Sequence, residues 1–489
     1  MMKALKYLLY IILGLMIFTV SRTFLFFPAA QPVKITLPTL SEAETTQIAE
    51  NLSKAITFKT ISQSLSVAPD HEAFTGFHAF LEETFPAAHG VMERELVSDY
   101  SLMYRWPGKA GGSKKPIAFL GHMDVVPVPE FGLKDWVHPP YAGTIDERGV
   151  IWGRGAVDDK GMLMALLEAA ERLVKAGFEP DRDIYFMFGH DEELGGDKGA
   201  AMMAARLKER GVQLDWAVDE GSAMVDGIIP GVNSPIALIS LGEKGSVTLK
   251  FSATEEGGHS SAPKDYTAAS IAAAAGVAVT ENQYPLVLDD TLERMFTAMA
   301  SQMNFQNRLV IGNLWLTKPL MKNELSKNPT IAAFMHTTTA FTMMQAGTKT
   351  NILPQYGEAH VNYRIHPRDT VDGVVDRARD IINDDRVEIT KLGGREATSM
   401  SSVSSEGYAD LSASIREVFG PIPVAPTLTV QGTDARHYYS VADNVYRFMP
   451  FVFEPDGLKQ IHGTNEAIST EAMVSQVVYF EDLIRRSAQ

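Results

Sequence analysis

The chain opens with a long apolar stretch that has almost no polar positions. Lys3 and Lys6 precede apolar residues 7–20, and a second apolar group, 24–27, follows a short polar break. Together they reach the roughly 20 residues that a membrane helix needs. The lysines would keep the N-terminus in the cytoplasm, so the rest would be exported to the periplasm or the extracellular space. We therefore expect a transmembrane anchor; the alternative is secretion after signal cleavage, for which residues 28–30 make a poor site.

Short apolar runs alternate with helical periodicity through the first half of the chain. Residues 116–120, 184–188 and 214–218 are typical of buried strands. Between the first two, apolar residues from Leu163 to Val174 fall on one face of a helix. This succession of strand, loop and helix predicts an α/β domain.

Strict alternation of polar and apolar residues begins at about residue 244. It appears at 247–251 and again at 359–365, and marks strands with one solvent-facing side. An alanine-rich helix at about 267–280 lies between them, and 285–345 reads as additional helical material. We therefore expect an inserted smaller α+β lid domain. The predicted segments are 1–30 (anchor or signal), 31–243 (catalytic domain, first part), 244–364 (lid) and 365–489 (catalytic domain, second part).

Composition limits the possible binding partners and the possible metal ligands. The 489 residues include 44 basic and 60 acidic ones, a net charge of −16, which argues against nucleic acid as a partner. The chain has no cysteine, so any metal must be held by histidine, aspartate and glutamate.

Histidine and acidic residues follow the predicted strands. His122 and Asp124 come just after 116–120 and point to the same side of an extended chain. Ligands of open α/β sheets bind at such strand ends, where this pair suits a metal ligand and its orienting carboxylate. A hydrogen-bonded histidine in a turn is the alternative. Asp158 and Asp159 share a glycine-rich turn, where a cation would offset their repulsion; an N-cap would explain only one of them.

A third acidic group, Asp191-Glu192-Glu193, follows residues 184–188. Like charges of this kind perturb pKa values most often at functional sites, although a solvated loop is the alternative. Convergence of the strand-end residues would give two histidines and three carboxylates, which suit two divalent ions sharing one carboxylate. Without thiolates the set favours zinc, with manganese or cobalt also compatible. The candidate ligands are His122, Asp158, Glu193, Glu220 and His462.

Glu192 is left free beside its neighbour Glu193. Two ions held close together would lower the pKa of a shared water and polarise a carbonyl. Glu192 could then take a proton from that water and pass it to a leaving amine. Asp124 would fix the tautomer of His122. These two are the candidate catalytic residues.

Six segments occur in a familiar order: GHMDVVP, GRGAVDDKG, HDEELGG, VDEG, GGHSSAP and IHGTNE. With them the chain resembles the M20 family of metallopeptidases, most of all its carboxypeptidase S and PM20D1-like branch, from about residue 50 to the end. The resemblance implies a mixed-sheet zinc-peptidase catalytic domain with an inserted lid. It also implies that Asp158 bridges both ions, that the peptide joining it to Asp159 is cis, and that Glu220, with Asp219 as the alternative, is a ligand.

The resemblance implies roles for the remaining motif residues. His122 would bind one ion, Glu193 would be a ligand and His462 would complete the second ion's set, with Glu192 as the general base. His259 would steady the oxyanion, and in dimeric relatives it comes from the partner subunit, which makes a homodimer an option here.

Two further positions match residues that line the substrate site in relatives, Asn351 and Arg364. An arginine can grip a carboxylate with two hydrogen bonds, although a structural salt bridge is the alternative for Arg364. The expected reaction is therefore metal-assisted hydrolysis of an amide beside a free carboxylate.

Two substrate classes remain open: peptides, or N-acyl amino acids in a reaction that could be reversible. Met295, Met299 and Met303 are most simply core residues, but such a group could also form an adaptable pocket for an acyl chain. A non-catalytic binding protein on the same scaffold would require a broken ligand set, and no expected position is missing.

Overall fold

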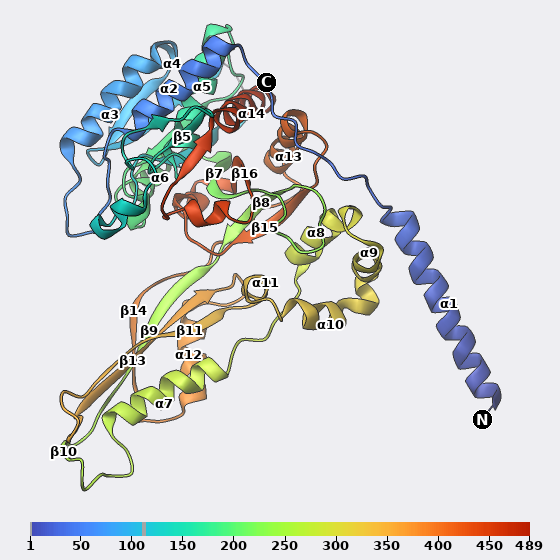
Figure 1. The fold of residues 1–489 in the computed structure, drawn as a ribbon, viewed down its shortest axis with the longest axis vertical. Coiled ribbons are helices and arrows are strands. Elements are labelled where there is room, and N and C mark those ends of the chain that lie inside the picture. The colour runs from blue at the N-terminus through green and yellow to red at the C-terminus, as the bar shows by residue number, and fades with distance from the viewer. Residues whose placement is uncertain (1, 110–113) are drawn as a thin grey trace.

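A computed structural model of the chain describes residues 2–109 and 114–489, and it shows two main sheets with helices packed on them (Figure 1). A long N-terminal helix, α1 (Met2–Phe26), extends away from the folded body. By length and composition α1 could cross a membrane, and only 11% of its most apolar window is buried.

The larger sheet is mixed and has eight strands. The neighbours β3–β6, β3–β7, β7–β16 and β8–β15 are parallel, whereas β1–β2 and β2–β6 are antiparallel. In spatial order the strands are β1 (Glu93–Val97), β2 (Ser101–Trp106), β6 (Ile184–Gly189), β3 (Ile117–His122), β7 (Leu214–Val225), β16 (Ala442–Phe453), β8 (Ile236–Glu243) and β15 (Val424–Thr429).

Both faces of this sheet are covered. Phe119 of β3 belongs to a buried core with the helices on one face, and its neighbours Ala118 and Leu120 belong to a core on the other face. Because alternate strand residues point to opposite faces, a continuous apolar run is needed to fill both cores. The first face carries α2 (Glu42–Ile56), α3 (His71–Thr84), α4 (Pro86–Val91), α5 (Lys160–Lys175), α13 (Glu406–Phe419) and α14 (Thr470–Ser487); the second carries α6 (Ala200–Glu209) and the 3-10 helix η4 (Asp434–Ser440).

The second sheet has four strands and lies beyond the end of the large sheet (Figure 1). Val247, Leu249 and Phe251 form its buried face under two helices, as the alternation predicts. Because β14 pairs with β9 and follows residue 364, we propose that this unit ends at Arg395 instead. Its elements are β9 (Gly245–Thr254), β11 (Thr338–Ala346), β13 (Tyr356–Ile365), β14 (Glu388–Arg395), α7 (Ala268–Glu281) and α12 (Val371–Ile382).

A helical insertion of residues 290–333 packs on the large sheet beside β15, with α8 against that strand. Met299 and Met303 are buried in its apolar core and the partly buried Met295 packs against that core, which supports their simpler interpretation as core residues. The predicted helical material ends before 338, because 338–346 forms the edge strand β11, in which threonines favour extended backbone. The inserted helices are α8 (Asp290–Met299), α9 (Phe305–Gly312), α10 (Leu314–Leu325) and α11 (Pro329–Ala333).

Candidate metal centre

The structure brings the five predicted metal ligands together at one edge of the large sheet. His122 ends β3, and Glu193 lies just after β6. Asp158 precedes α5, whereas His462 lies in the loop before the short strand β17 (Ala467–Ser469). Glu220 lies within β7, which continues to Val225 instead of ending before residue 219. Parallel strands β3, β6 and β7 explain the convergence, because their carboxyl ends meet at the same edge.

Asp158 stands between the two histidines. Its Oδ1 lies 3.1 Å from His122 Nε2, and its Oδ2 lies 3.2 Å from His462 Nε2. Glu193 Oε2 lies 3.0 Å from the same His462 nitrogen. Asp158 therefore directs one carboxylate oxygen at each histidine.

The potential ligand atoms form two overlapping groups, and within each group all the atoms lie within 4.8 Å of one another. One contains His122, Asp158 and Glu193, and the other contains His122, Glu192 and Glu220. Asp219 is directed elsewhere, because its Oδ2 accepts a hydrogen bond of 2.6 Å from the backbone N–H of Ala435. Neighbouring strand residues point to opposite faces, so β7 presents Glu220 and not Asp219 to the cluster.

The cluster has the electrostatics of a cation site. Burial and the nearby Asp158 and Glu192 raise the pKa of Glu220 well above its usual value. Hydrogen bonds to Asp158 and Glu193 raise the pKa of His462 to about 10. Glu193 Oε1 is buried and has no hydrogen-bond partner among the described residues. A crowded, partly unsatisfied set of carboxylates and imidazoles fits divalent cations, which would neutralise it.

Asp124 supports the centre in two ways. The Nδ1–H of His122 donates to the backbone oxygen of Asp124 at 2.9 Å, and one Asp124 carboxylate oxygen lies 3.4 Å from the same nitrogen. This tautomer leaves Nε2 for a metal. The two carboxylate oxygens of Asp124 also accept hydrogen bonds of 3.2 Å each from the backbone N–H groups of Glu192 and Glu193. Asp124 therefore holds the histidine and the glutamate turn in one arrangement.

Glu466 is a supporting residue that sequence reasoning missed. Its buried Oε1 accepts hydrogen bonds from the backbone N–H groups of Gly155, Val157 and Asp158, at 3.1, 2.8 and 3.0 Å. The loop that it holds includes the cis peptide between Asp158 and Asp159, as the resemblance implies. In the sequence, Glu466 stands out only as the last residue of the IHGTNE motif, in which the histidine alone was assigned a role.

The structure does not bring His259 and Asn351 to the metal cluster. Both are exposed and lie side by side, because β10 (Gly258–His259) pairs with β12 (Ile352–Leu353). Figure 1 shows β10 at the end of the small sheet that is far from the large one. His259 Nδ1 instead contacts Ser261 Oγ at 2.8 Å.

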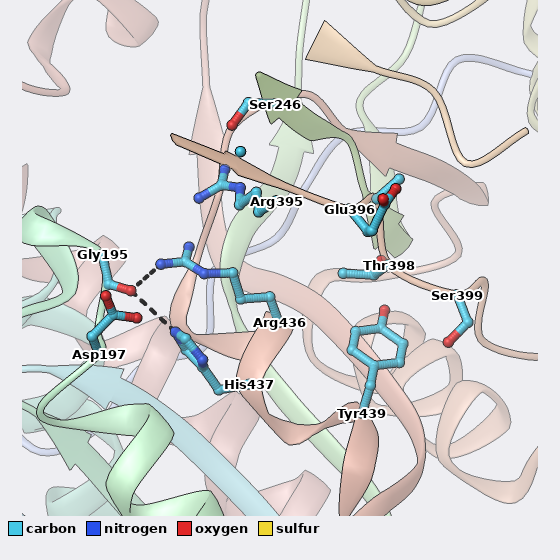
Figure 2. Close-up of a pocket in the computed structure, with 12 residues that line it drawn as sticks. Gly195, Asp197, Ser246, Arg395, Glu396, Thr398, Ser399, Arg436, His437 and Tyr439 are labelled. Atoms are coloured by element: carbon cyan, nitrogen blue, oxygen red, sulfur yellow. Dashed lines mark hydrogen bonds between the residues drawn. The ribbon is translucent and has the colours of Figure 1, made fainter. Parts of the chain in front are cut away.

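Arg364 belongs to a row of polar residues on the open face of the small sheet. It lies opposite Ser246 on β9, which lies opposite Arg395 on β14. Figure 2 shows Arg395 beside Arg436 in a cavity of about 640 Å³. Arg436 donates to the backbone oxygens of Gly195 and Thr433. Burial and the charges of Arg436 and Arg364 lower the pKa of Arg395, so this row is suited to an anion.

A second cavity, of about 400 Å³, adjoins the metal cluster. Asp158, Glu192, Glu220 and His462 line one part of it, and most of the remaining surface is apolar. The apolar lining includes side chains of β7, β8, β15 and β16, of the residue after α11 and of the segment before His462: Val225, Leu238, Leu428, Met449, Phe453, Phe334, Leu458 and Ile461. An apolar group could therefore lie directly beside the polar centre.

Comparison with known proteins gives consistent results. The model of peptidase family M20/M25/M40 matches residues 118–486. "Probable carboxypeptidase S-like 2" of Dictyostelium discoideum is 37% identical, covering 98% of this chain and 93% of its own. The human "N-fatty-acyl-amino acid synthase/hydrolase PM20D1" is 35% identical, covering 91% and 89%. The solved M20 family metallo-carboxypeptidase Sso-CP2 of Sulfolobus solfataricus has a TM-score of 0.62, covering 91% and 99%; at 18% identity it shows a shared fold alone.

Proposed function

Because the chain belongs to peptidase family M20/M25/M40 and is a hydrolase of that family, we propose that it hydrolyses an amide bond beside a free carboxylate. Two divalent ions, which the donor set suggests are zinc, would be held by the converging side chains. Bound there, they would supply Lewis acidity toward the amide and toward water. The proposed ligands are His122, Asp158, Glu193, Glu220 and His462.

Glu192 is the proposed general base. It lies with His122 and Glu220 in one ligand-atom group and lines the apolar cavity, where an amide would enter. Burial and the carboxylates of Asp434 and Glu193, opposed by His122, raise the pKa of Glu192 well above its usual value. A base of raised pKa takes a proton from water and returns it to the leaving amine. Asp124 keeps the backbone of Glu192 in place through its hydrogen bond of 3.2 Å.

The free carboxylate of the substrate would be bound by Arg364 and Arg395, the two arginines of the polar row on the small sheet. Arg364 and Arg395 flank Ser246, and adjacent strands are about 4.8 Å apart, so the two guanidiniums can approach one carboxylate from two sides. Arg395 Nε is buried without a hydrogen-bond partner among the described residues, which supports a role in holding an anion.

The lining of the apolar cavity indicates which class of substrate the site would accept. A peptide needs polar partners for its backbone, whereas a fatty acyl group needs apolar surface. The lining by Phe334, Phe453 and other apolar side chains therefore favours an N-acyl amino acid with a long acyl chain. The name of the human relative, which joins synthase and hydrolase, makes the reverse reaction a second candidate for the same site. Peptide cleavage remains the alternative suggested by the carboxypeptidase S-like relatives.

The proposal is tested with the zinc-loaded full chain on matched substrates. N-oleoyl-leucine, N-acetyl-leucine and a leucine dipeptide are compared by kcat/KM, with N-oleoyl-leucinamide as the control without a carboxylate. We expect the oleoyl acid to be the best substrate and the amide control to be poor. Preference for the dipeptide would contradict the acyl assignment, and equal rates on the acid and the amide would contradict carboxylate recognition.

We also propose that α1 anchors the chain in a membrane with the catalytic domain exported. Lys3 and Lys6 precede the apolar part of α1, as in a cytoplasmic N-terminus. The segment after α1 is attached to the body, since Ala30 N–H donates to Ser301 O at 2.9 Å. Secretion after cleavage is the alternative. We also propose a homodimer as an option, in which the exposed His259 of one subunit would reach the metal centre of the other subunit.

A further inference from the structure

The helical insertion exposes an apolar surface that the proposed reaction does not use. On α10, the exposed fractions of Trp315, Leu316 and Leu320 are 59%, 45% and 57%. Met321, also on α10, is buried in the core of the insertion. At 100° per residue, the three exposed side chains lie on the opposite side of α10 from Met321. We call these three residues the α10 surface.

Helix α1 lies against the start of this surface. The rings of Phe18 and Trp315 meet edge to face, with 6.2 Å between their centroids. At the start of α9, Phe305 stacks on Phe24 of α1 with centroids 5.3 Å apart. Asn313 Nδ2 donates to Thr23 Oγ1 at 3.2 Å. The contacts are specific, so α1 has a defined position beside α9 and α10 (Figure 1).

The end of α1 is also attached to the folded body. Phe27 packs against the core of the insertion, and Val33 N–H donates to Ser234 Oγ at 2.9 Å. The direction of α1 relative to the catalytic domain is therefore set by contacts and not by a free linker.

We infer that α10 is an interfacial helix that inserts its surface into the same membrane that α1 enters. This inference rests on the proposed anchoring by α1. From Phe18 to Phe26 a helix rises about 12 Å, so the contact between Phe18 and Trp315 lies about that far from the C-terminal end of α1, toward the N-terminus. Tryptophan is enriched at membrane–water interfaces, where its ring lies at the level of the headgroups. A helix with such an apolar side and flanking charged residues, here Lys318 and Lys322, is typical of the membrane interface.

The surface is continuous with a lipid-facing helix, which identifies lipid as its occupant. Most of α1 is exposed and apolar, and Trp315 extends that exposed apolar surface onto α10. The chain then passes directly to the apolar cavity: α11 begins after residues 326–328, and its Thr330 and Ala333 line that cavity with Phe334. An acyl chain dissolved in the membrane would thus meet the cavity wall close to the lipid surface.

The test uses the lack of cysteine, which allows single labelled cysteines in the full chain. A nitroxide label is attached to the cysteine of Leu320→Cys, and the protein is placed in nanodiscs of zwitterionic phospholipid. The frequency with which the label collides with oxygen is then compared with the frequency of its collisions with a water-soluble nickel chelate. Phe131→Cys, at an 83% exposed position in the catalytic domain, is the matched control. We expect the label at Leu320 to collide preferentially with oxygen and the label at Phe131 to collide preferentially with the chelate.

Three results would overturn the inference. Equal chelate access at both positions would place the α10 surface in water, and protection of Leu320 from both reagents would mean that protein covers it. Mass spectrometry of the membrane-bound chain reports separately whether α1 is retained, and its loss would also overturn the inference. None of these three readouts requires turnover, so a failure of this inference can be distinguished from a failure of the proposed hydrolysis. The double variant Trp315→Ser/Leu320→Ser should lose turnover of vesicle-borne N-oleoyl-leucine but not of N-acetyl-leucine.

Discussion

The buried carboxylate of Glu466 lies 2.6 Å from the guanidinium of Arg154, although 311 residues separate the two in the sequence. The pair is almost fully buried, and the same carboxylate holds three backbone N–H groups of the loop that ends in Asp158. The C-terminal segment that carries His462 is thereby joined to the loop that carries the shared carboxylate.

Removing that carboxylate should disturb the metal centre from outside it. Glu466→Ala leaves the buried charge of Arg154 unpaired, which costs on the order of 3–5 kcal/mol. We expect a lower thermal midpoint and fewer zinc equivalents after gel filtration. Glu466→Gln keeps the shape and should lose less of both. An alanine variant with unchanged zinc content would argue against this coupling.

His462 should be needed for one ion and not for both. His462→Ala removes the nitrogen that faces Asp158 and Glu193, whereas His122 keeps its own contact with Asp158. Elemental analysis should therefore find about one equivalent fewer than in the wild type, since the second set loses a ligand. The exposed His71→Ala serves as the control. Full metal content in the His462 variant would refute this ligand assignment.

Arg395 should affect substrate binding more than chemistry. Replacing it with methionine removes a charge-assisted hydrogen bond of about 1.5–3 kcal/mol, so KM for an N-acyl amino acid should rise by roughly ten- to a hundredfold while kcat changes little. Arg386→Met, which loses an exposed pair with Asp384 and a contact with the Tyr266 ring, is the control. Steady-state kinetics check both variants, and a fall in kcat at constant KM would contradict the role.

Lys244 should make stability depend on pH. Burial and the charges of Arg364 and Arg368 lower the pKa of Lys244 to about 7, while its ammonium donates to the backbone oxygens of Ala333 and His336 at 2.9 Å each. Between pH 7 and the ordinary lysine pKa the unfolded chain binds more protons, so stability rises with pH, by at most about 1.4 kcal/mol per unit.

Lys244→Met should remove that part of the slope. Urea midpoints measured from pH 6.5 to 9.5 would rise more steeply in the wild type than in the variant. Lys391→Met, at an exposed ion pair with Asp372, should keep the wild-type slope. Parallel slopes for wild type and Lys244→Met would show that this lysine titrates normally.

Local sequence pattern was sufficient for the α/β body and for most of the residues that meet at the edge of its sheet. Apolar runs marked β3 and β6, and the acidic and histidine residues that follow such strands could be expected to meet at one edge. Glu220 could be separated from Asp219 only by the resemblance, because the strand was expected to end before both. In the structure β7 continues, and alternation along it selects Glu220.

Long-range pairings could not be predicted. Arg395 lies in one row with Arg364 only because β13 and β14 both pair with β9, from which each is more than a hundred residues away in the sequence, and no local pattern reports that register. Glu466 and Arg154 each look like ordinary polar residues until the fold buries them together. Most of strand β11 falls within residues 285–345, which were predicted to be helical, and its edge pairing with β13 could not be read from the local pattern.

The central claim is that Glu192 acts as a base beside two bound ions, and one comparison tests it most directly. Hydrolysis of N-oleoyl-leucine is followed for the zinc-loaded wild type and for Glu192→Gln, with zinc counted in the same samples. We predict unchanged zinc content and a fall in kcat of about 10²–10⁴-fold, the usual contribution of a general base. A glutamine variant that retains most of the wild-type turnover at full zinc content would contradict the account.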